Sequence, residues 1–389
     1  MKRLKLGLLP RVAIAIGLGV VCGLFFPDWL VRIFLTINSL FGNFLNFIIP
    51  LLILGLVAPG IADLGKGAGR LLLITALLAY GFTLFSGFFT YFSCDFVYPW
   101  LLNSADELTP VSGEAAVALT PYFTVAMPPL MDVMTSLILA FTLGLGMSVI
   151  DGNRLKGMME DFEEIIDLVI MSVIIPLLPL YIFGIFLNMT DSGQVSGVFG
   201  VFLKIIVVIF VMTVILLFIQ FFIAGMVDKK NPFRLFRNML PAYMTALGTQ
   251  SSAATIPVTL EQTIKNGVRP ELAGFVIPLC ATIHLSGSTM KIVACAMAIM
   301  LMSGIDIHFG QFAGFIMMLG IAMVAAPGVP GGAIMAALGL LQSMLGFDET
   351  AQGLMIALYI AMDSFGTATN VTGDGAIAVI VNRIYNKNK

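Results

Sequence analysis

The chain has 389 residues, of which 59% are hydrophobic and 11% are charged, and its formal net charge is −2. Soluble domains carry about 25% charged residues, so no water-soluble fold would hide this much apolar surface, and most of the chain must be surrounded by lipid. The small negative net charge excludes a nucleic-acid partner, because binding a phosphate backbone needs an excess of basic side chains. The scattered cysteines and the two histidines fit neither a disulfide framework nor a metal cluster, and no resident cofactor is expected.

Apolar runs of membrane-spanning length predict about eight transmembrane helices. Such a helix needs about 20 mainly apolar residues. The runs centre on residues 12–26, 33–59, 71–93, 124–150, 165–188, 198–227, 271–303 and 350–382. A signal peptide is the alternative for the first run, but no small-residue cleavage site follows it. The sequence therefore predicts an all-α polytopic membrane protein.

Two further apolar stretches, residues 239–263 and 312–346, are interrupted by Gly, Pro and Ser. Each fits a re-entrant helical hairpin that enters and leaves the membrane by one side. The distribution of basic residues supports this arrangement, because Lys and Arg prefer cytoplasmic loops and gather on one side only if both hairpins return to their own side. These residues are Lys2, Arg3, Lys5, Arg11, Lys66, Arg70, Arg154, Lys156, Lys229, Lys230, Arg234, Arg237, Lys265, Arg269, Arg383, Lys387 and Lys389.

This topology predicts a multi-pass protein of the cell inner membrane with both termini in the cytoplasm. The first hairpin opens from the cytoplasm and the second from outside, which is an inverted arrangement. Each hairpin is followed by a helix with polar residues at its middle. A repeat of broken hairpin plus discontinuous helix is how transporters build a binding site at the membrane midplane.

The tips of both hairpins are rich in helix-breaking or hydroxylated residues. The first reads Gly248 to Pro257 and contains Ser251 and Ser252, whose hydroxyls, with the free amides of two half-helices, suit a carboxylate. Close packing of small residues is the alternative there. The second tip, residues 325–333, has two prolines and three glycines, so it is either a cation-coordinating gate or a plain tight turn.

The last apolar run carries four polar residues, Asp363, Thr367, Asn370 and Asp374. Their spacing of four, three and four places them on one helical face. An ionisable residue at membrane depth costs about 2.5–3.5 kcal/mol on insertion scales and usually marks a pathway or a binding site. An aspartate on such a face can hold a substrate ammonium or Na⁺, or can carry a proton.

The run at 271–303 contains a polar patch with glycine at its middle, which suggests local unwinding. Its members are Thr282, His284, Ser286, Gly287, Ser288, Thr289 and Lys291. A buried Lys291 needs an anionic partner or loses its proton, whereas snorkelling to the membrane interface is the alternative.

These pieces together resemble the glutamate transporter family, the dicarboxylate/amino acid:cation symporters, over nearly the whole chain. The resemblance is carried by Asn231 to Arg234 leading into Ser251 to Pro257, by Gly328 to Gly331, and by Asp363, Thr367 and Asn370 to Asp374. It implies an elevator-type homotrimer with inverted repeats. Residues 1–65 would form scaffold helices 1 and 2, 66–120 helix 3 of the transport domain with an outer loop, and 121–195 scaffold helices 4 and 5. Residues 196–389 would complete the transport domain with helix 6, hairpin 1 (about 231–268), helix 7, hairpin 2 (about 310–347) and helix 8.

The resemblance also implies roles for the polar residues. Ser252 and Asn370 would hold the substrate carboxylate and Asp363 and Thr367 its ammonium, with Ser251, Val329 and Gly331 at the same site. Asp374 and Asn370 would bind Na⁺, and Ser286 stands at a further sodium position.

Departures from the family pattern concern both ion and substrate. Where the family has Asn-Met-Asp-Gly-Thr, this chain has His284 to Ser288, and the matching part of helix 3, Leu77 to Ala79, has no hydroxyl. One cation site looks dismantled, and we hypothesise that Lys291, with His284 nearby, replaces that cation, which would reduce sodium dependence or shift coupling toward protons.

The departure that concerns the substrate is at Gly366. Family members that carry acidic amino acids have an arginine at this position, which would pair with the second carboxylate of the substrate. The sequence therefore favours a neutral amino acid, and a dicarboxylate stays open if Lys291 supplies the charge. Other readings are a passive channel on the same scaffold and a substrate-sensing receptor. An intramembrane enzyme is disfavoured, because the polar residues form no nucleophile–base pair.

Overall fold

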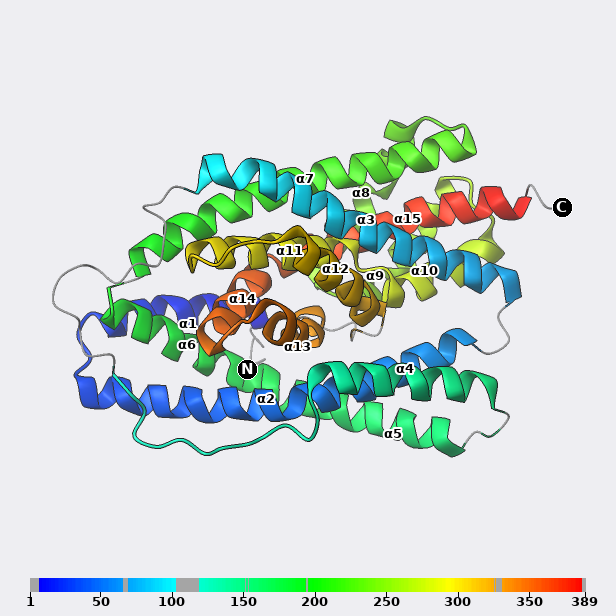
Figure 1. The fold of residues 1–389 in the computed structure, drawn as a ribbon. Coiled ribbons are helices and arrows are strands. Elements are labelled where there is room, and N and C mark those ends of the chain that lie inside the picture. The colour runs from blue at the N-terminus through cyan, green and yellow to red at the C-terminus, as the bar shows by residue number, and fades with distance from the viewer. Residues whose placement is uncertain are drawn as a thin grey trace, which may run out of the picture.

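A computed structural model describes residues 7–65, 69–102, 119–150, 152, 154–193, 195–324, 326 and 331–386. These residues form helices and loops without strands, and the long helices run along one common direction (Figure 1). The predicted all-α fold is confirmed. The described residues do not include most of the expected outer loop, residues 103–118. They also leave out residues 325, 327, 328, 330 and Val329 of the second hairpin tip.

The helices are, in chain order, α1 (Leu8–Gly23), α2 (Asp28–Gly65), α3 (Gly69–Leu101), α4 (Val133–Val149), α5 (Arg154–Val169), a π-helical turn (Ile170–Ile174), α6 (Ile175–Asp191), α7 (Val195–Asp228), α8 (Pro232–Thr249), α9 (Ser252–Lys265), α10 (Pro270–Ile283), α11 (Ser286–Met302), α12 (Phe309–Val324), α13 (Gly332–Leu345), α14 (Glu349–Ala361) and α15 (Asp363–Asn386).

Among the described residues, five helical stretches are long and apolar enough to cross a membrane. They are Asp28–Ala62, Arg70–Leu101, Arg154–Asp191, Gly200–Asp228 and Pro270–Met302, and α14 with α15 makes a sixth span bent by 61°. The remaining two of the eight predicted spans correspond to α1 and α4, which are apolar but shorter than about 20 residues.

Both interrupted stretches form helical hairpins. α8 begins where the Asn231 side chain accepts hydrogen bonds from the backbone N–H groups of Phe233 and Arg234, with Pro232 in the first turn. Gln250, in the left-handed region at φ 54°, then turns the chain into α9, and Ser251 caps that helix. α8 and α9 open toward the end of the molecule that holds the C-terminus, whereas α12 and α13 open toward the opposite end (Figure 1). The two hairpins are therefore inverted relative to each other.

Each hairpin is followed by a broken helix. α10 and α11 are separated by His284 and Leu285, whose backbone is not helical (φ −107°, ψ 98° and φ −119°, ψ 46°). α14 and α15 meet at Met362 in the 61° bend. The unwinding expected in the polar patch is confirmed, and it leaves the backbone N–H groups at the start of α11 free for side-chain partners.

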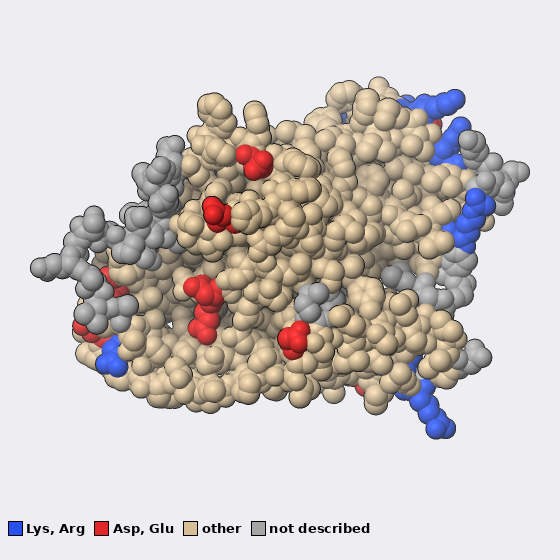
Figure 2. Space-filling view, in the orientation of Figure 1, with Lys and Arg blue, Asp and Glu red and all other residues tan. Residues whose placement is uncertain are grey.

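The helices group into two bodies. α1, α2, α4, α5 and α6 pack on one another, and α3, α7 to α11 and α15 form a second group. Within the second group, α8, α10, α15 and parts of α3 and α7 enclose a separate apolar core, whereas α11 and the rest of α3 and α7 belong to the larger core that also includes the first group. α13 and α14 lie between the groups, where α13 contacts α2 and α4 and α14 contacts α1 and α6 (Figure 1). Lys and Arg side chains gather mainly at the end that holds the C-terminus, whereas the rest of the visible face is largely uncharged and its few charged side chains are mostly acidic (Figure 2).

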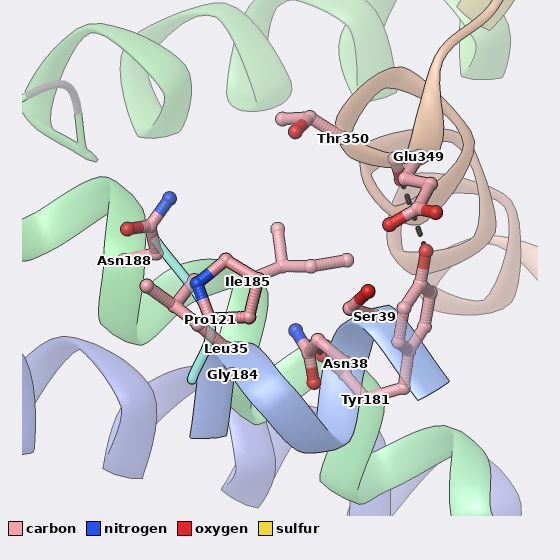
Figure 3. Close-up of a pocket in the computed structure, with 10 residues that line it drawn as sticks. All are labelled: Leu35, Asn38, Ser39, Pro121, Tyr181, Gly184, Ile185, Asn188, Glu349 and Thr350. Carbon is pink, nitrogen blue, oxygen red and sulfur yellow. Dashed lines mark hydrogen bonds between the residues drawn. The ribbon is translucent and has the colours of Figure 1, made fainter. Parts of the chain in front are cut away.

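A cavity of about 190 Å³ lies between the first group and the start of α14. Figure 3 shows it between α2, α6 and α14, with Asn38 and Tyr181 on one wall and Glu349 on the other. The Tyr181 hydroxyl donates to the Glu349 carbonyl over 3.0 Å, and Asn38 Nδ2 donates to the Tyr181 carbonyl over 3.1 Å. The contact between the groups is thus partly polar and incompletely filled.

Candidate functional site

The site lies where the breaks in both helices meet the second hairpin. Asp363, the first residue of α15, is buried, and both of its carboxylate oxygens have partners. Oδ1 accepts from Lys291 Nζ over 3.2 Å, and Oδ2 accepts from the backbone N–H of Gly331 over 2.9 Å. Gly331 precedes α13 with φ 78°, a conformation that glycine adopts without strain. The aspartate therefore joins α11, α15 and the tip of hairpin 2.

Lys291 projects from α11 and has no exposed surface. Its Nζ also donates to the Met362 carbonyl over 3.3 Å and lies 3.8 Å from the centroid of the Tyr359 ring. A carboxylate, a carbonyl at the end of α14 and an aromatic face thus surround the ammonium group, which is what a buried cation requires. The alternative of snorkelling to the membrane interface does not apply, since the side chain ends in the protein interior.

Gly366 leaves the space that the Lys291 side chain fills. A Cβ atom at position 366 would lie 2.2 Å from Lys291 Cε and 2.4 Å from Nζ. The position where the family pattern has an arginine on the last helix is therefore taken up by a lysine from α11. A positive charge is therefore present at this point, so the lack of an arginine at position 366 does not by itself favour a neutral substrate.

Asn370, two turns into α15, caps the start of α11. Its Oδ1 accepts from the backbone N–H groups of Gly287 (2.8 Å) and Ser288 (3.4 Å), and its Nδ2 donates to Ser288 Oγ over 3.1 Å. The Tyr359 hydroxyl donates to the same Ser288 oxygen over 3.1 Å. Asn370 thus satisfies the backbone groups that the break in the helix exposes.

Asp374 pairs with His284, with 2.8 Å between Asp374 Oδ1 and His284 Nδ1, and both side chains are buried. Within the described part of the chain, Asp374 Oδ2 and His284 Nε2 have no hydrogen-bond partner. Ser286 is held from two sides, because its hydroxyl accepts from Gln220 Nε2 over 3.2 Å and its carbonyl accepts from Ser86 Oγ over 2.6 Å.

The oxygens expected to bind Na⁺ are therefore only partly available. Asn370 Oδ1 already accepts two backbone hydrogen bonds and the Ser286 hydroxyl accepts one, whereas Asp374 Oδ2 is unpartnered among the described residues. Hard cations such as Na⁺ need several oxygen ligands, so the three residues fit a sodium ion poorly in this arrangement. Lys291 does not lie against this cluster as hypothesised. Its ammonium contacts Asp363, and His284 is the residue paired with Asp374.

The remaining expected residues take local roles. Thr367 donates to the Asp363 carbonyl over 3.1 Å, and Ser251 Oγ accepts from the Ala254 N–H over 3.3 Å at the start of α9. Ser252 is buried in the first turn of α9, a helix that packs against α15. Val329 lies outside the described residues.

The sequence interpretation missed two contributors. Ser86 on α3 lies more than two turns beyond Leu77, which is 61% exposed, so the stretch 77–79 was the wrong place to look for the site-facing hydroxyl. Gln220 lies in the last third of α7, the most apolar of the described helices, and a lone amide in such a run is the signal that could have indicated it.

Replacing Gly366 by alanine is expected to push Lys291 away from Asp363 and to lower the free energy of unfolding by about 1–3 kcal/mol, because the new methyl group overpacks a filled interior. Thermal denaturation of the purified protein measures this change. Gly274→Ala is the control, since nothing lies within 4 Å of a Cβ at that helical position. Equal melting temperatures for the two variants would contradict the close fit of Lys291.

Inverted hairpins, two broken helices and a buried polar site at their meeting point define a multi-pass membrane transporter of the elevator type. The profile of the sodium:dicarboxylate symporter family matches residues 8–384, and the chain belongs to this family. It is a transporter and not an enzyme, the family's activity is cation-coupled symport, and the resemblance to glutamate transporters is confirmed.

Named relatives span bacteria and animals. The chain is 27% identical to a serine/threonine transporter, SstT, of Streptococcus suis (strain 05ZYH33) over 340 residues, which are 85% of this chain and 93% of the relative. It is 31% identical to excitatory amino acid transporter 1 of Rattus norvegicus over 241 residues, 60% of this chain and 43% of that protein. For excitatory amino acid transporter 2 of Homo sapiens the identity is 33% over 160 residues, 41% of this chain and 28% of that protein.

Proposed function

We propose that this protein carries a small carboxylate-bearing solute, coupled to a cation, across the inner membrane by an elevator movement. The observation that carries the proposal is the meeting of Asp363, Lys291 and the Gly331 amide in the interior, where two broken helices and a hairpin tip converge. Ionisable groups at such a depth are rare in membrane proteins unless they serve a solute or an ion. Family membership supplies the class of activity.

In this proposal the moving and fixed parts follow the two packing groups. The scaffold comprises residues 1–65 and 121–195, and the transport domain comprises residues 66–120 and 196–389. The support is that α13 and α14 contact the other group through a surface that includes a cavity and the Tyr181–Glu349 hydrogen bond. A contact that is not completely filled can be remade in a second position, which a sliding domain requires. A homotrimer formed through the scaffold follows from the resemblance.

The orientation follows from charge. The end with most of the Lys and Arg side chains, which also holds the C-terminus, would face the cytoplasm (Figure 2). Hairpin 1 then opens from the cytoplasm and hairpin 2 from outside.

Two kinds of substrate each have a supporting observation. A neutral amino acid agrees with a relative named a serine/threonine transporter. A carboxylate without an amino group, mono- or dicarboxylic, agrees with the Lys291–Asp363 pair, because the aspartate that would bind an ammonium already has one. For the coupling ion, the partly occupied ligands around Asp374 favour reduced dependence on Na⁺, with H⁺ as the alternative cation.

Uptake into proteoliposomes tests the proposal. We expect saturable accumulation of a labelled carboxylate above its external concentration when an inward gradient of Na⁺ or of H⁺ is imposed, since coupling to a cation moves the solute uphill. Each gradient is applied separately, and collapse of the gradient should release the accumulated solute. Equilibration to the external concentration under every gradient would instead support a passive channel.

A further inference from the structure

Asp363 is the acidic group of the site to which a substrate cation would be drawn, yet each of its oxygens already has a hydrogen-bond donor and its charge is already paired. Oδ1 is paired with Lys291 Nζ at 3.2 Å, and Oδ2 accepts the Gly331 N–H at 2.9 Å. A solute with an ammonium group could bind this carboxylate only by displacing the lysine or by placing a second positive charge beside the buried Lys291 ammonium, which repels it. We propose that Lys291 is a specificity-determining residue, a built-in ammonium group that occupies Asp363, so that the site accepts carboxylates without an amino group and rejects amino acids.

The position of Lys291 is built into three helices. Its ammonium group has a carboxylate on α15, the Met362 carbonyl between α14 and α15, and the Tyr359 ring of α14 as neighbours. Gly366 provides the gap for the side chain, since even a Cβ atom there would lie 2.2 Å from Lys291 Cε. The gap at Gly366 and the partners from two other helix segments together fix the ammonium group beside Asp363.

Displacing this ammonium group is unfavourable for a defined reason. Lys291 is fully buried, so on leaving Asp363 it would keep a charge in the interior without its counter-ion. An amino acid bound through Asp363 would therefore have to offset an unpaired buried lysine, whereas the same solute without its amino group would leave the ion pair intact. Selectivity then arises from a repulsive element as well as from attractive contacts.

The inference rests on the proposed function and narrows its substrate class. The carboxylate of the solute would be held elsewhere, by the hydroxyl and amide groups at the start of α9, where Ser251 and Ser252 lie. A purely structural role for the ion pair predicts no difference between solutes that differ only by an amino group, which makes the two roles separable.

The experiment compares two pairs of solutes, succinate with L-aspartate and propionate with L-alanine, each pair differing by one amino group. For the wild-type protein we expect half-maximal thermal stabilisation, and half-maximal uptake, at concentrations at least about tenfold lower for succinate and propionate. In Lys291→Met this preference should shrink or reverse, because the freed Asp363 can then bind an ammonium. Lys265→Met is the matched control, as Lys265 is exposed and lies at the base of hairpin 1.

A double variant keeps the test decisive if Lys291→Met alone fails to fold. Lys291→Met combined with Asp363→Asn leaves no buried charge unpaired, and in it the two members of each pair should bind equally. Tighter binding of L-aspartate or L-alanine by the wild type, or an unchanged preference in Lys291→Met or in the double variant, overturns the inference while leaving the transport function standing. If the wild type neither binds nor accumulates any of the four solutes, the proposed function fails and the inference with it.

Discussion

Asp363→Asn is expected to lower the free energy of unfolding by about 3–5 kcal/mol, which is typical when one partner of a buried ion pair is removed. Lys291 has no exposed surface, and an amide at position 363 would leave its charge without a counter-ion. The substitution also removes a carboxylate oxygen that accepts the Gly331 N–H, so the tip of hairpin 2 loses a charge-assisted hydrogen bond. Thermal denaturation of the purified protein in detergent or lipid measures the effect.

The exposed pair Lys265–Glu261 provides the comparison. Its atoms are 2.6 Å apart, but both side chains are more than half exposed, so Glu261→Gln should leave stability unchanged. Asp363→Asn together with Lys291→Met should recover most of the stability, because a neutral pair replaces the charged one. A double variant as unstable as Asp363→Asn alone would show that the loss does not come from the unpaired lysine.

Gly353→Leu is expected to reduce uptake at least about tenfold while the protein remains folded. Gly353 lies on α14 where this helix meets α6, and a Cβ atom there would be 1.8 Å from Ile185 Cδ1. Overpacking of this kind typically costs about 1–3 kcal/mol, and here it falls on the contact between α14 and α6 of the first packing group. If transport requires α14 to slide along α6, the new side chain destabilises the conformation seen here relative to the others in the transport cycle. The protein then rarely adopts this conformation, and uptake slows. Uptake measured alongside the melting temperature separates this effect from unfolding.

A compensating change sharpens this prediction. Ile185→Ala should restore uptake to Gly353→Leu, since it removes the atoms with which the new side chain collides. Gly274→Leu, at a helical position with nothing within 4 Å of its Cβ, should leave uptake unchanged. Loss of uptake that Ile185→Ala fails to restore would contradict a role for this contact in the movement.

The amino-acid composition and the spacing of apolar and polar residues were enough to identify a membrane protein, its two hairpins and the helix that carries the site. Apolar runs of sufficient length have no alternative to helices in lipid, because every backbone N–H and C=O must be paired within the segment. Helix geometry alone likewise places Asp363, Asn370 and Asp374 on one face, because of their spacing in the sequence. All three are buried and have hydrogen-bond partners in the structure.

The pairing of those residues was decided only by the tertiary structure. Helical spacing specifies which side chains share a face, but not which residues from other helices lie opposite them. Lys291 could be placed near the polar stripe from the sequence, yet its contact with Asp363 and not with the cluster around Ser286 depends on the gap at Gly366, on a helix 75 residues further along the chain. Ser86 and Gln220 reach Ser286 across sequence separations of 200 and 66 residues, which no local pattern encodes. Close packing in three dimensions, where one missing Cβ determines where a buried charge can lie, fixed these contacts.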